Sequence, residues 1–461
     1  METRQAQGMP LPTLAAMVVG SMVGAGVFSL PQQFASGTGV AGALITWTIA
    51  GTGMLMLALV FQSLAVRQPD LNAGVYAYAK AGFGEYLGFF SAFGYWASAC
   101  MGNTTYWVLI MSTIGAVLPV LGEGDTFVAV LVSSIGVWTF FLLVRRGVRE
   151  AAVINRVVTV AKLVPILVFI VLMLFYLDPA VFADNITTGG SLFTQVRGTM
   201  LITVFVFLGV EGASVYSRHA RRRADIGKAT VLGFLSVLAV FASVTIVSYG
   251  ILPAGQIAEL RQPSMAGVME AAVGTWGSVF ISVGLIISVG GAYLAWSLMS
   301  AEVLFAAAKD GDMPRFLKRT NASDVPQRAL LMSSILVQIM LVVVTFSEDA
   351  FDFALDLTSS LSLVPYLLAA GYALKLALTR GGGLVVGALA TAYTIFLLYA
   401  AGPTLLLLSF IIYAPATVLF VMARREQGRR LFRPPELVIL AVSVLGALTG
   451  IVLLATHAIT T

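Results

Sequence analysis

Residues 19–28 read VGSMVGAGVF and stand in the middle of the first long apolar segment of the chain. Each of the three glycines in this stretch lowers helix stability by about 1 kcal/mol relative to alanine. A break in a helix that crosses a bilayer leaves amides and carbonyls unpaired, which is tolerated only where other groups satisfy them. A second stretch, FVFLGVEGAS at residues 205–214, repeats this pattern. The sequence therefore predicts two interrupted membrane-spanning helices.

Two explanations fit such glycine-rich stretches. Gly20 and Gly24 are spaced as in a motif for close helix packing, which needs no ligand. Alternatively, an amino-acid zwitterion satisfies the break, because its carboxylate accepts from freed amides and its ammonium donates to freed carbonyls. Because the two stretches each open a block of five predicted spans, they favour paired repeats around a binding site.

The composition is that of a membrane protein. Of the 461 residues, 59% are hydrophobic and 11% are charged, whereas a soluble domain carries about 25% charged residues. A spanning helix needs about 20 apolar residues, and we interpret the first segment as a permanent span and not a cleaved signal peptide. Gly402 and Pro403 separate two of the predicted segments and fit either a tight turn or a kink. Thirteen segments fit the template: 12–33, 42–66, 86–118, 126–144, 153–176, 198–217, 228–251, 276–306, 329–347, 352–376, 384–401, 403–423 and 436–456.

The distribution of charge gives an orientation. With the N-terminus in the cytoplasm, 24 of the 27 Lys and Arg residues fall in cytoplasmic loops, and the exceptions are Arg197, Arg261 and Lys162. The other loops are acidic. This alternation follows the positive-inside rule and places the C-terminus outside. The basic residues are therefore membrane anchors, and no nucleic-acid partner is expected.

Two charged residues are predicted to lie deep within spans. Glu211 lies beside the break in the sixth span, where a carboxylate costs several kcal/mol and is usually functional, although a structural hydrogen bond is the alternative. Lys162 lies in the fifth span, close enough to the cytoplasmic end for its side chain to extend to that interface instead. Trp296, well inside its span, offers an aromatic face to a cationic ligand. Further aromatic faces come from Tyr95, Trp96, Tyr106 and Phe205.

Other classes of function lack support. The single cysteine, Cys100, and the distant His219 and His457 provide no metal-ligand spacing. We find no nucleophile–base pair and no phosphate-binding loop, which argues against an enzyme and against ATP-driven transport. A channel would need a repeated filter or a ring of charges. No cofactor is predicted.

Three motifs identify a resemblance to the amino acid–polyamine–organocation superfamily. They are GSMVGAGVFSLP at 20–31, GVEGAS at 209–214 and AAAKDGDMP at 306–314. The stretches 73–84 and 210–233 resemble most closely the basic amino acid/polyamine antiporters that exchange arginine for ornithine. The resemblance covers nearly the whole chain.

The resemblance implies an all-α membrane protein with a LeuT-like five-plus-five inverted repeat and alternating access. Residues 1–461 would form a single transporter domain, with 12–176 as the first repeat, 198–376 as the second and 384–456 as additional helices. The substrate carboxylate would meet backbone amides of Ser21, Met22, Val23, Gly24, Ala25 and Gly26. The α-ammonium would meet carbonyls between Phe205 and Leu208.

The resemblance also assigns side chains by position. Trp296 matches the aromatic residue that stacks on a guanidinium, Asn103 a polar substrate contact, Tyr95 a proximal gate and Glu211 a distal gate. Two positions depart from the arginine/agmatine branch. Ala25 stands where that branch has serine, and Phe205 stands where it has tryptophan, so the choice of substrate is left open.

Lys162 matches the lysine of proton-coupled members, where it resembles a stand-in for sodium. The expected function is exchange of cationic amino acids, arginine for ornithine. The alternative is a proton-coupled lysine or arginine permease. The expected location is the bacterial inner membrane, with the lipid bilayer and small cationic amino acids as partners. The sequence leaves the oligomeric state open between a monomer and a homodimer.

Overall fold

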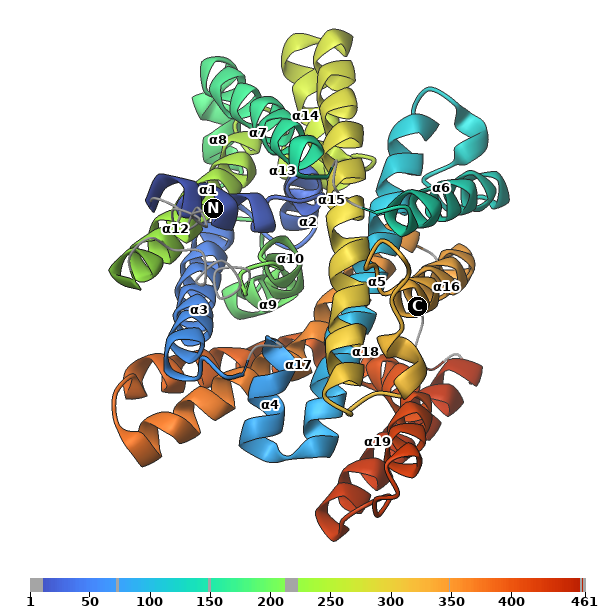
Figure 1. Ribbon diagram of the computed structural model, residues 1–461. Helices are drawn as coiled ribbons and strands as arrows, with labels where there is room; N and C mark the ends of the chain where they lie inside the picture. The colour runs from blue at the N-terminus through green and yellow to red at the C-terminus, as the bar shows by residue number, and fades with distance from the viewer. Residues whose placement is uncertain are drawn as a thin grey trace, which may run out of the picture.

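The computed structural model describes residues 11–71, 74–147, 151–211, 223–347, 349–456 and 458. Regular structure in these residues is helical, without a β-strand (Figure 1). Eight of the described helices are long and apolar enough to cross a membrane. The all-helical membrane class is thereby confirmed.

The first predicted span is interrupted as expected. Helix α1 (Leu11–Met22) ends at the glycine-rich stretch, a 3₁₀ turn η1 (Gly26–Phe28) follows, and helix α2 (Leu30–Ala35) continues the chain. The sixth predicted span, 198–217, begins at the last residue of α9 (Leu192–Gly198) and contains α10 (Met200–Val206), after which residues 207–211 form turns. Its second half, 212–217, lies outside the described residues.

The remaining long helices correspond to the other predicted segments. They are α3 (Val40–Arg67), α5 (Glu85–Gly115), α6 (Phe127–Arg145), α7 (Ala151–Tyr176), α12 (Arg223–Ser248), α15 (Thr275–Lys309), α16 (Gln327–Val343), α17 (Ala350–Arg380), α18 (Leu384–Glu426) and α19 (Pro434–Ala455). Shorter helices lie in the connections: α4 (Val75–Phe83), α8 (Pro179–Asp184), α13 (Ala254–Ala258) and α14 (Ser264–Val273). Further 3₁₀ turns are η2 (Pro119–Leu121), η4 (Arg315–Lys318) and η5 (Val344–Phe346).

Helix α18 contains the eleventh and twelfth predicted segments. Gly402 has φ 74° and ψ 173° inside it, so two helices meet there at a kink. Pro403 contributes to this break, because proline has no amide hydrogen to donate within a helix. The structure therefore has a kink at the pair that the sequence left open between a kink and a tight turn.

Helix α5 is the central element of the molecule. Nearly all of its residues are buried, and it packs against α4, α15, α16 and α17. Its many small and hydroxyl-bearing side chains suit a helix surrounded by protein instead of lipid. Helix α1 packs against α12, while α10 packs against α17, α18 and α3. These contacts place the two interrupted spans beside the core helices.

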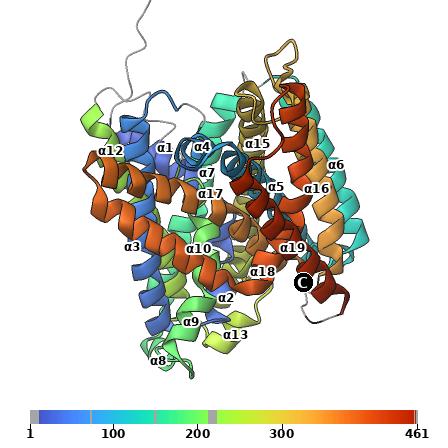
Figure 2. The same ribbon diagram turned by 90° about the horizontal axis from the view of Figure 1, so that it is seen from below.

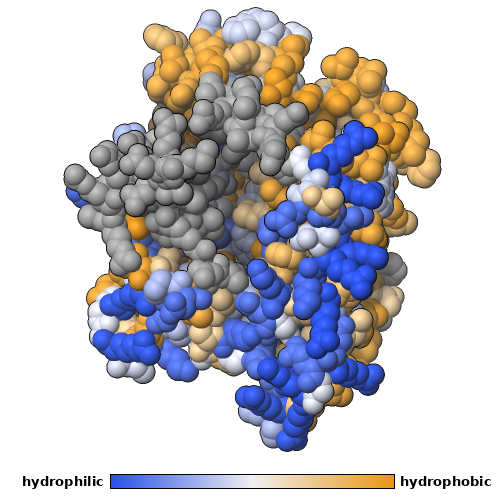
Figure 3. Space-filling model, viewed as in Figure 1, coloured by the Kyte–Doolittle hydropathy of each residue, from blue (hydrophilic) through white to orange (hydrophobic). Residues whose placement is uncertain are grey.

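The surface separates into apolar and polar regions. In Figure 3, hydrophobic residues cover the top of the view, around α14 and α15, and hydrophilic residues gather in the lower part, around α4 and α19. Figure 2 shows α17 and α18 passing across α3. Many large apolar side chains are exposed on the outer helices, among them Phe127, Phe175 and Leu445. Such exposure is expected for helices that face lipid.

Candidate functional site

The break in the first span leaves several backbone amides without hydrogen-bond acceptors among the described residues. The last helical bond runs from the amide of Val23 to the carbonyl of Val19, at 3.0 Å, and the 3₁₀ turn begins with Phe28 bonding to Ala25. Between these bonds, the amides of Gly24, Ala25 and Gly26 have no acceptor among the described residues. The amides start a helical segment, so their partial positive charge favours an anion.

The carbonyls on the other side of this break have a partner. Lys162 reaches from α7 and donates from Nζ to the carbonyl of Gly20 at 2.5 Å and to that of Val23 at 2.8 Å. Its side chain is buried, with 5% exposure. The ammonium therefore caps the end of α1 and does not extend to the cytoplasmic interface.

The break in the sixth span packs directly against the first span at Gly209. Gly209 has φ +101°, and a Cβ atom there would overlap the carbonyl of Ser21. Glycine is required by both its backbone conformation and this close approach. The Ser21 hydroxyl lies 2.8 Å from the carbonyl of Val18 and 3.1 Å from that of Gly209. The two interrupted spans therefore touch at their breaks.

The Glu211 carboxylate accepts hydrogen bonds from three segments of the chain. Tyr95 on α5 donates to Oε1, Tyr366 on α17 donates to Oε2 at 2.8 Å, and the amide of Gly209 donates to Oε2 at 3.2 Å. The carboxylate is 5% exposed. A buried carboxylate is tolerated where several donors satisfy it. The group thus links the sixth-span break to α5 and α17.

An aromatic pair extends from this carboxylate. The ring of Tyr95 lies 6.4 Å from that of Trp296 on α15, with an angle of 38° between the planes. Trp296 is half-buried and packs against the hydrophobic core. Because the Tyr95 hydroxyl also holds Glu211, movement of the ring and movement of the carboxylate are mechanically connected.

Asn103 presents a buried acceptor beside Ser297, the residue that follows Trp296 on α15. Its Nδ2 contacts Oγ of Ser297 at 3.4 Å, and its Oδ1 has no donor among the described residues. The side chain is 1% exposed. A buried oxygen without a donor costs about 1–3 kcal/mol. Oδ1 is therefore positioned to accept a hydrogen bond from a ligand.

The other predicted site residues contribute mainly through their backbones. The side chains of Met22, Val23 and Ala25 are almost fully buried in the hydrophobic core. Leu208 and Phe205 are also buried, and a Cβ atom on Gly26 would lie 2.8 Å from Cδ1 of Phe205. The structure thus brings the first break next to α10, as a shared site requires.

Several polar residues near the breaks have roles that the sequence does not predict. Tyr366 was not anticipated as a partner of Glu211, and its position beside Pro365 in mid-span was the available signal. Glu211 is predicted to be the sole carboxylate deep within a span, and Asp352 and Asp356 lie at the end of one, in the first two turns of α17. Gln33, at the end of the first span, donates to Asp352.

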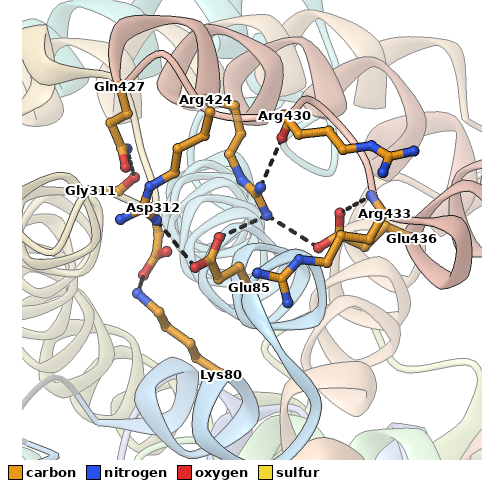
Figure 4. A network of polar contacts seen from close by, with 10 residues as sticks. Lys80, Glu85, Gly311, Asp312, Arg424, Gln427, Arg430, Arg433 and Glu436 are labelled. Atoms are coloured by element: carbon orange, nitrogen blue, oxygen red, sulfur yellow. Dashed lines mark hydrogen bonds and ion pairs between the residues drawn. The ribbon is translucent and has the colours of Figure 1, made fainter.

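A second polar cluster joins the ends of α4, α5, α15, α18 and α19 (Figure 4). Buried Arg424 pairs with Glu85 at 2.7 Å and with Glu436 at 3.2 Å. Lys80 pairs with Asp312 at 2.7 Å, within the third of the sequence motifs. Burial raises the pKa of Asp312 to about 6, against the opposing effect of Lys80. This cluster links α18 to α5 and α19 through Arg424, and links the segment after α15 to α4 through the pair of Lys80 and Asp312.

The chain belongs to the amino acid permease family, whose sequence pattern matches residues 10–443. It is 47% identical to the arginine/ornithine antiporter of Pseudomonas aeruginosa, with 98% of both chains covered. It is 40% identical to an L-lysine transport protein of Corynebacterium glutamicum, over 95% of this chain and 94% of the relative. It is 37% identical to the arginine/ornithine antiporter of Latilactobacillus sakei, with 98% of both chains covered.

Proposed function

We propose that this protein exchanges arginine for ornithine across the bacterial cytoplasmic membrane by alternating access. The observation that carries this function is the 47% identity to the Pseudomonas antiporter over 98% of both chains. The residues around the two breaks offer groups of the right chemistry. They comprise open amides for a carboxylate, a buried acceptor for a donor group and an aromatic face for a cation.

The proposed architecture has thirteen spans. Residues 12–176 and 198–376 form two inverted repeats, and 384–456 form the additional helices. The N-terminus is cytoplasmic and the C-terminus lies outside. In such folds the substrate binds at the interrupted helices, and one repeat moves against the other around that site.

The substrate is bound at both ends. Its carboxylate accepts from the amides of Gly24, Ala25 and Gly26, and its α-ammonium donates to carbonyls between Phe205 and Leu208. Its side chain extends toward α5 and α15, where the guanidinium or ammonium stacks on Trp296 and donates to Oδ1 of Asn103. A cation over a tryptophan face gains about 0.5–2 kcal/mol.

Gating follows from the hydrogen bonds of Tyr95. When substrate displaces the ring of Tyr95, the hydroxyl that holds Glu211 moves as well. Glu211 also bonds to the turn at Gly209 and to Tyr366 on α17. Occupancy of the site is thereby transmitted to the second interrupted span. Lys162 has a static role and holds the end of α1 in one arrangement.

A proton-coupled permease is the second candidate. Two observations favour it: the 40% identity to a lysine transport protein and the buried ammonium of Lys162 between α1 and α7. Release of that proton would free the carbonyls of Gly20 and Val23 and would alter the packing of the repeats. Transport would then depend on a pH gradient.

Counterflow in proteoliposomes tests the proposed function. Vesicles preloaded with ornithine should accumulate labelled arginine, and external arginine, ornithine and lysine should compete for uptake, whereas neutral amino acids should not. Empty vesicles with an imposed pH gradient serve as the control. Uptake that needs the gradient but no internal amino acid would favour the permease. Failure of every cationic amino acid to enter under both conditions, preloaded vesicles and empty vesicles with a pH gradient, would exclude both candidates.

A further inference from the structure

One face of α5 presents two polar groups toward the site. Asn103 and Tyr106 are three residues apart, so they are neighbours on the same side of the helix. Oδ1 of Asn103 is a buried acceptor without a donor among the described residues. The Tyr106 hydroxyl can donate a hydrogen bond.

The Tyr106 hydroxyl lies directly against the first break. A Cβ atom on Gly24 would stand 3.1 Å from Oη of Tyr106. The tyrosine is 7% exposed, and its hydroxyl makes no hydrogen bond to a side chain or carbonyl of the described residues. Buried tyrosine hydroxyls usually find a partner. The hydroxyl therefore points to a group that occupies the space beside the open amides.

The break has few other hydroxyl donors. Ala25 is fully buried and supplies a methyl group, at a position where the arginine/agmatine branch has serine. The Ser21 hydroxyl already bonds to the carbonyl of Val18 or Gly209. Tyr106, reaching in from α5, supplies a hydroxyl at the same break.

We propose that the Tyr106 hydroxyl donates a hydrogen bond to the substrate's α-carboxylate and makes the carrier select amino acids over their decarboxylated amines. This inference rests on the proposed function, in which the carboxylate lies at the amides of Gly24 to Gly26. Asn103, one helical turn away, accepts from the cationic end. The two residues on α5 therefore fix the direction in which the substrate lies in the site.

A purely structural role for Tyr106 makes a different prediction. If the residue only fills space, its ring is what matters, and loss of the hydroxyl should affect all ligands equally. A hydrogen bond to a charged group should instead matter only for ligands that carry the carboxylate. Arginine and agmatine differ by that one group, so they separate the two roles.

The test compares Tyr106→Phe with wild-type protein by titration calorimetry of the full-length chain in detergent. We expect arginine and ornithine to bind about tenfold or more weakly to the variant, as for a lost hydrogen bond to a charged group. Agmatine and putrescine should bind to both proteins with affinities within about twofold. Tyr399→Phe, which alters an exposed tyrosine on α18, is the matched control and should change nothing.

Three results would overturn the inference. The first is an unchanged arginine affinity in a folded Tyr106→Phe variant, and the second is an equal loss for arginine and agmatine. The third is wild-type protein that binds agmatine as tightly as arginine. Melting temperatures verify that the variant is folded. Wild-type protein that binds no cationic amino acid would instead reject the proposed function.

Discussion

The two interrupted spans satisfy their backbone groups in different ways. At the sixth-span break, the amide of Gly209 donates to the carboxylate of Glu211, which the protein itself supplies. At the first break, Lys162 occupies the carbonyls of Gly20 and Val23, but the amides of Gly24 to Gly26 have no acceptor in the described chain. The amide at the sixth-span break is thus satisfied by a carboxylate of the protein, whereas the amides at the first break could be satisfied by the carboxylate of a ligand.

This difference assigns separate tasks to the two breaks. We propose that the first break binds the substrate's carboxylate, because, among the described residues of the two breaks, its amides lack acceptors. We propose that the sixth break transmits occupancy, because its carboxylate accepts hydrogen bonds from Tyr95 and Tyr366 on two other helices.

Replacing Lys162 should have the largest effect. Lys162→Met leaves two buried carbonyls without their donor, at about 1–3 kcal/mol each. We expect ornithine-driven arginine uptake to fall about 100-fold or more in proteoliposomes. Between pH 5.5 and 8.5, wild-type uptake should stay flat and the variant should be impaired throughout. A wild-type titration that disappears in Lys162→Met would show a proton-coupling role and contradict the static one.

Removing the charge of Glu211 should impair exchange more than binding. Glu211→Gln keeps the size, but its amide nitrogen cannot accept from Tyr95 or Tyr366. We expect the exchange rate to fall about tenfold or more, for loss of one to two kcal/mol of charge-assisted hydrogen bonding. Equilibrium arginine binding should change by less than about threefold. Near-normal exchange in well-folded protein would refute the gate assignment.

Substitution of Trp296 should weaken binding of the substrate's cationic group without altering either break directly. Trp296→Leu should weaken arginine binding by about 2- to 30-fold, the value of one cation–π contact. Trp296→Phe retains an aromatic face and should lose less. Binding of neutral amino acids provides the comparison. An equal loss for neutral and cationic ligands would remove the recognition role.

Substitution of Gly209 should mainly lower the stability of the folded protein. Gly209→Ala places a side chain at φ +101° and against the carbonyl of Ser21, which we expect to cost about 1–3 kcal/mol. The melting temperature in detergent should fall. Gly198→Ala is the control, since no atom of another residue lies within 4 Å of a Cβ there. Equal melting temperatures for the two variants would show that the contact between the breaks is not tight.

Much of this arrangement could be predicted from the sequence. Apolar segments and glycine pairs locate the helices and the two breaks, because both follow from local properties of the chain. A break at Gly402 follows from its pairing with Pro403, although the sequence left a kink and a tight turn both open. Glu211 and Lys162 stand out because a charge within a span is costly.

The partners of these groups could not be predicted in the same way. Tyr366 is 155 positions from Glu211. Its hydroxyl comes within hydrogen-bond distance of that carboxylate only when α17 packs beside α10. The same holds for Tyr106, because only packing of α5 against the first break brings its hydroxyl to Gly24. Long-range packing determines such pairs, and no local pattern in the sequence records it.

Hydrogen–deuterium exchange measured by mass spectrometry tests the central contrast most directly. In substrate-free protein, peptides that cover residues 24–26 should exchange quickly, and those that cover Gly209 should be protected. Saturating arginine should slow exchange at residues 24–26 by about tenfold or more, in proportion to the occupied fraction. Little change is expected at Gly209. Protection by arginine at Gly209 alone, with residues 24–26 unaffected, would contradict the account.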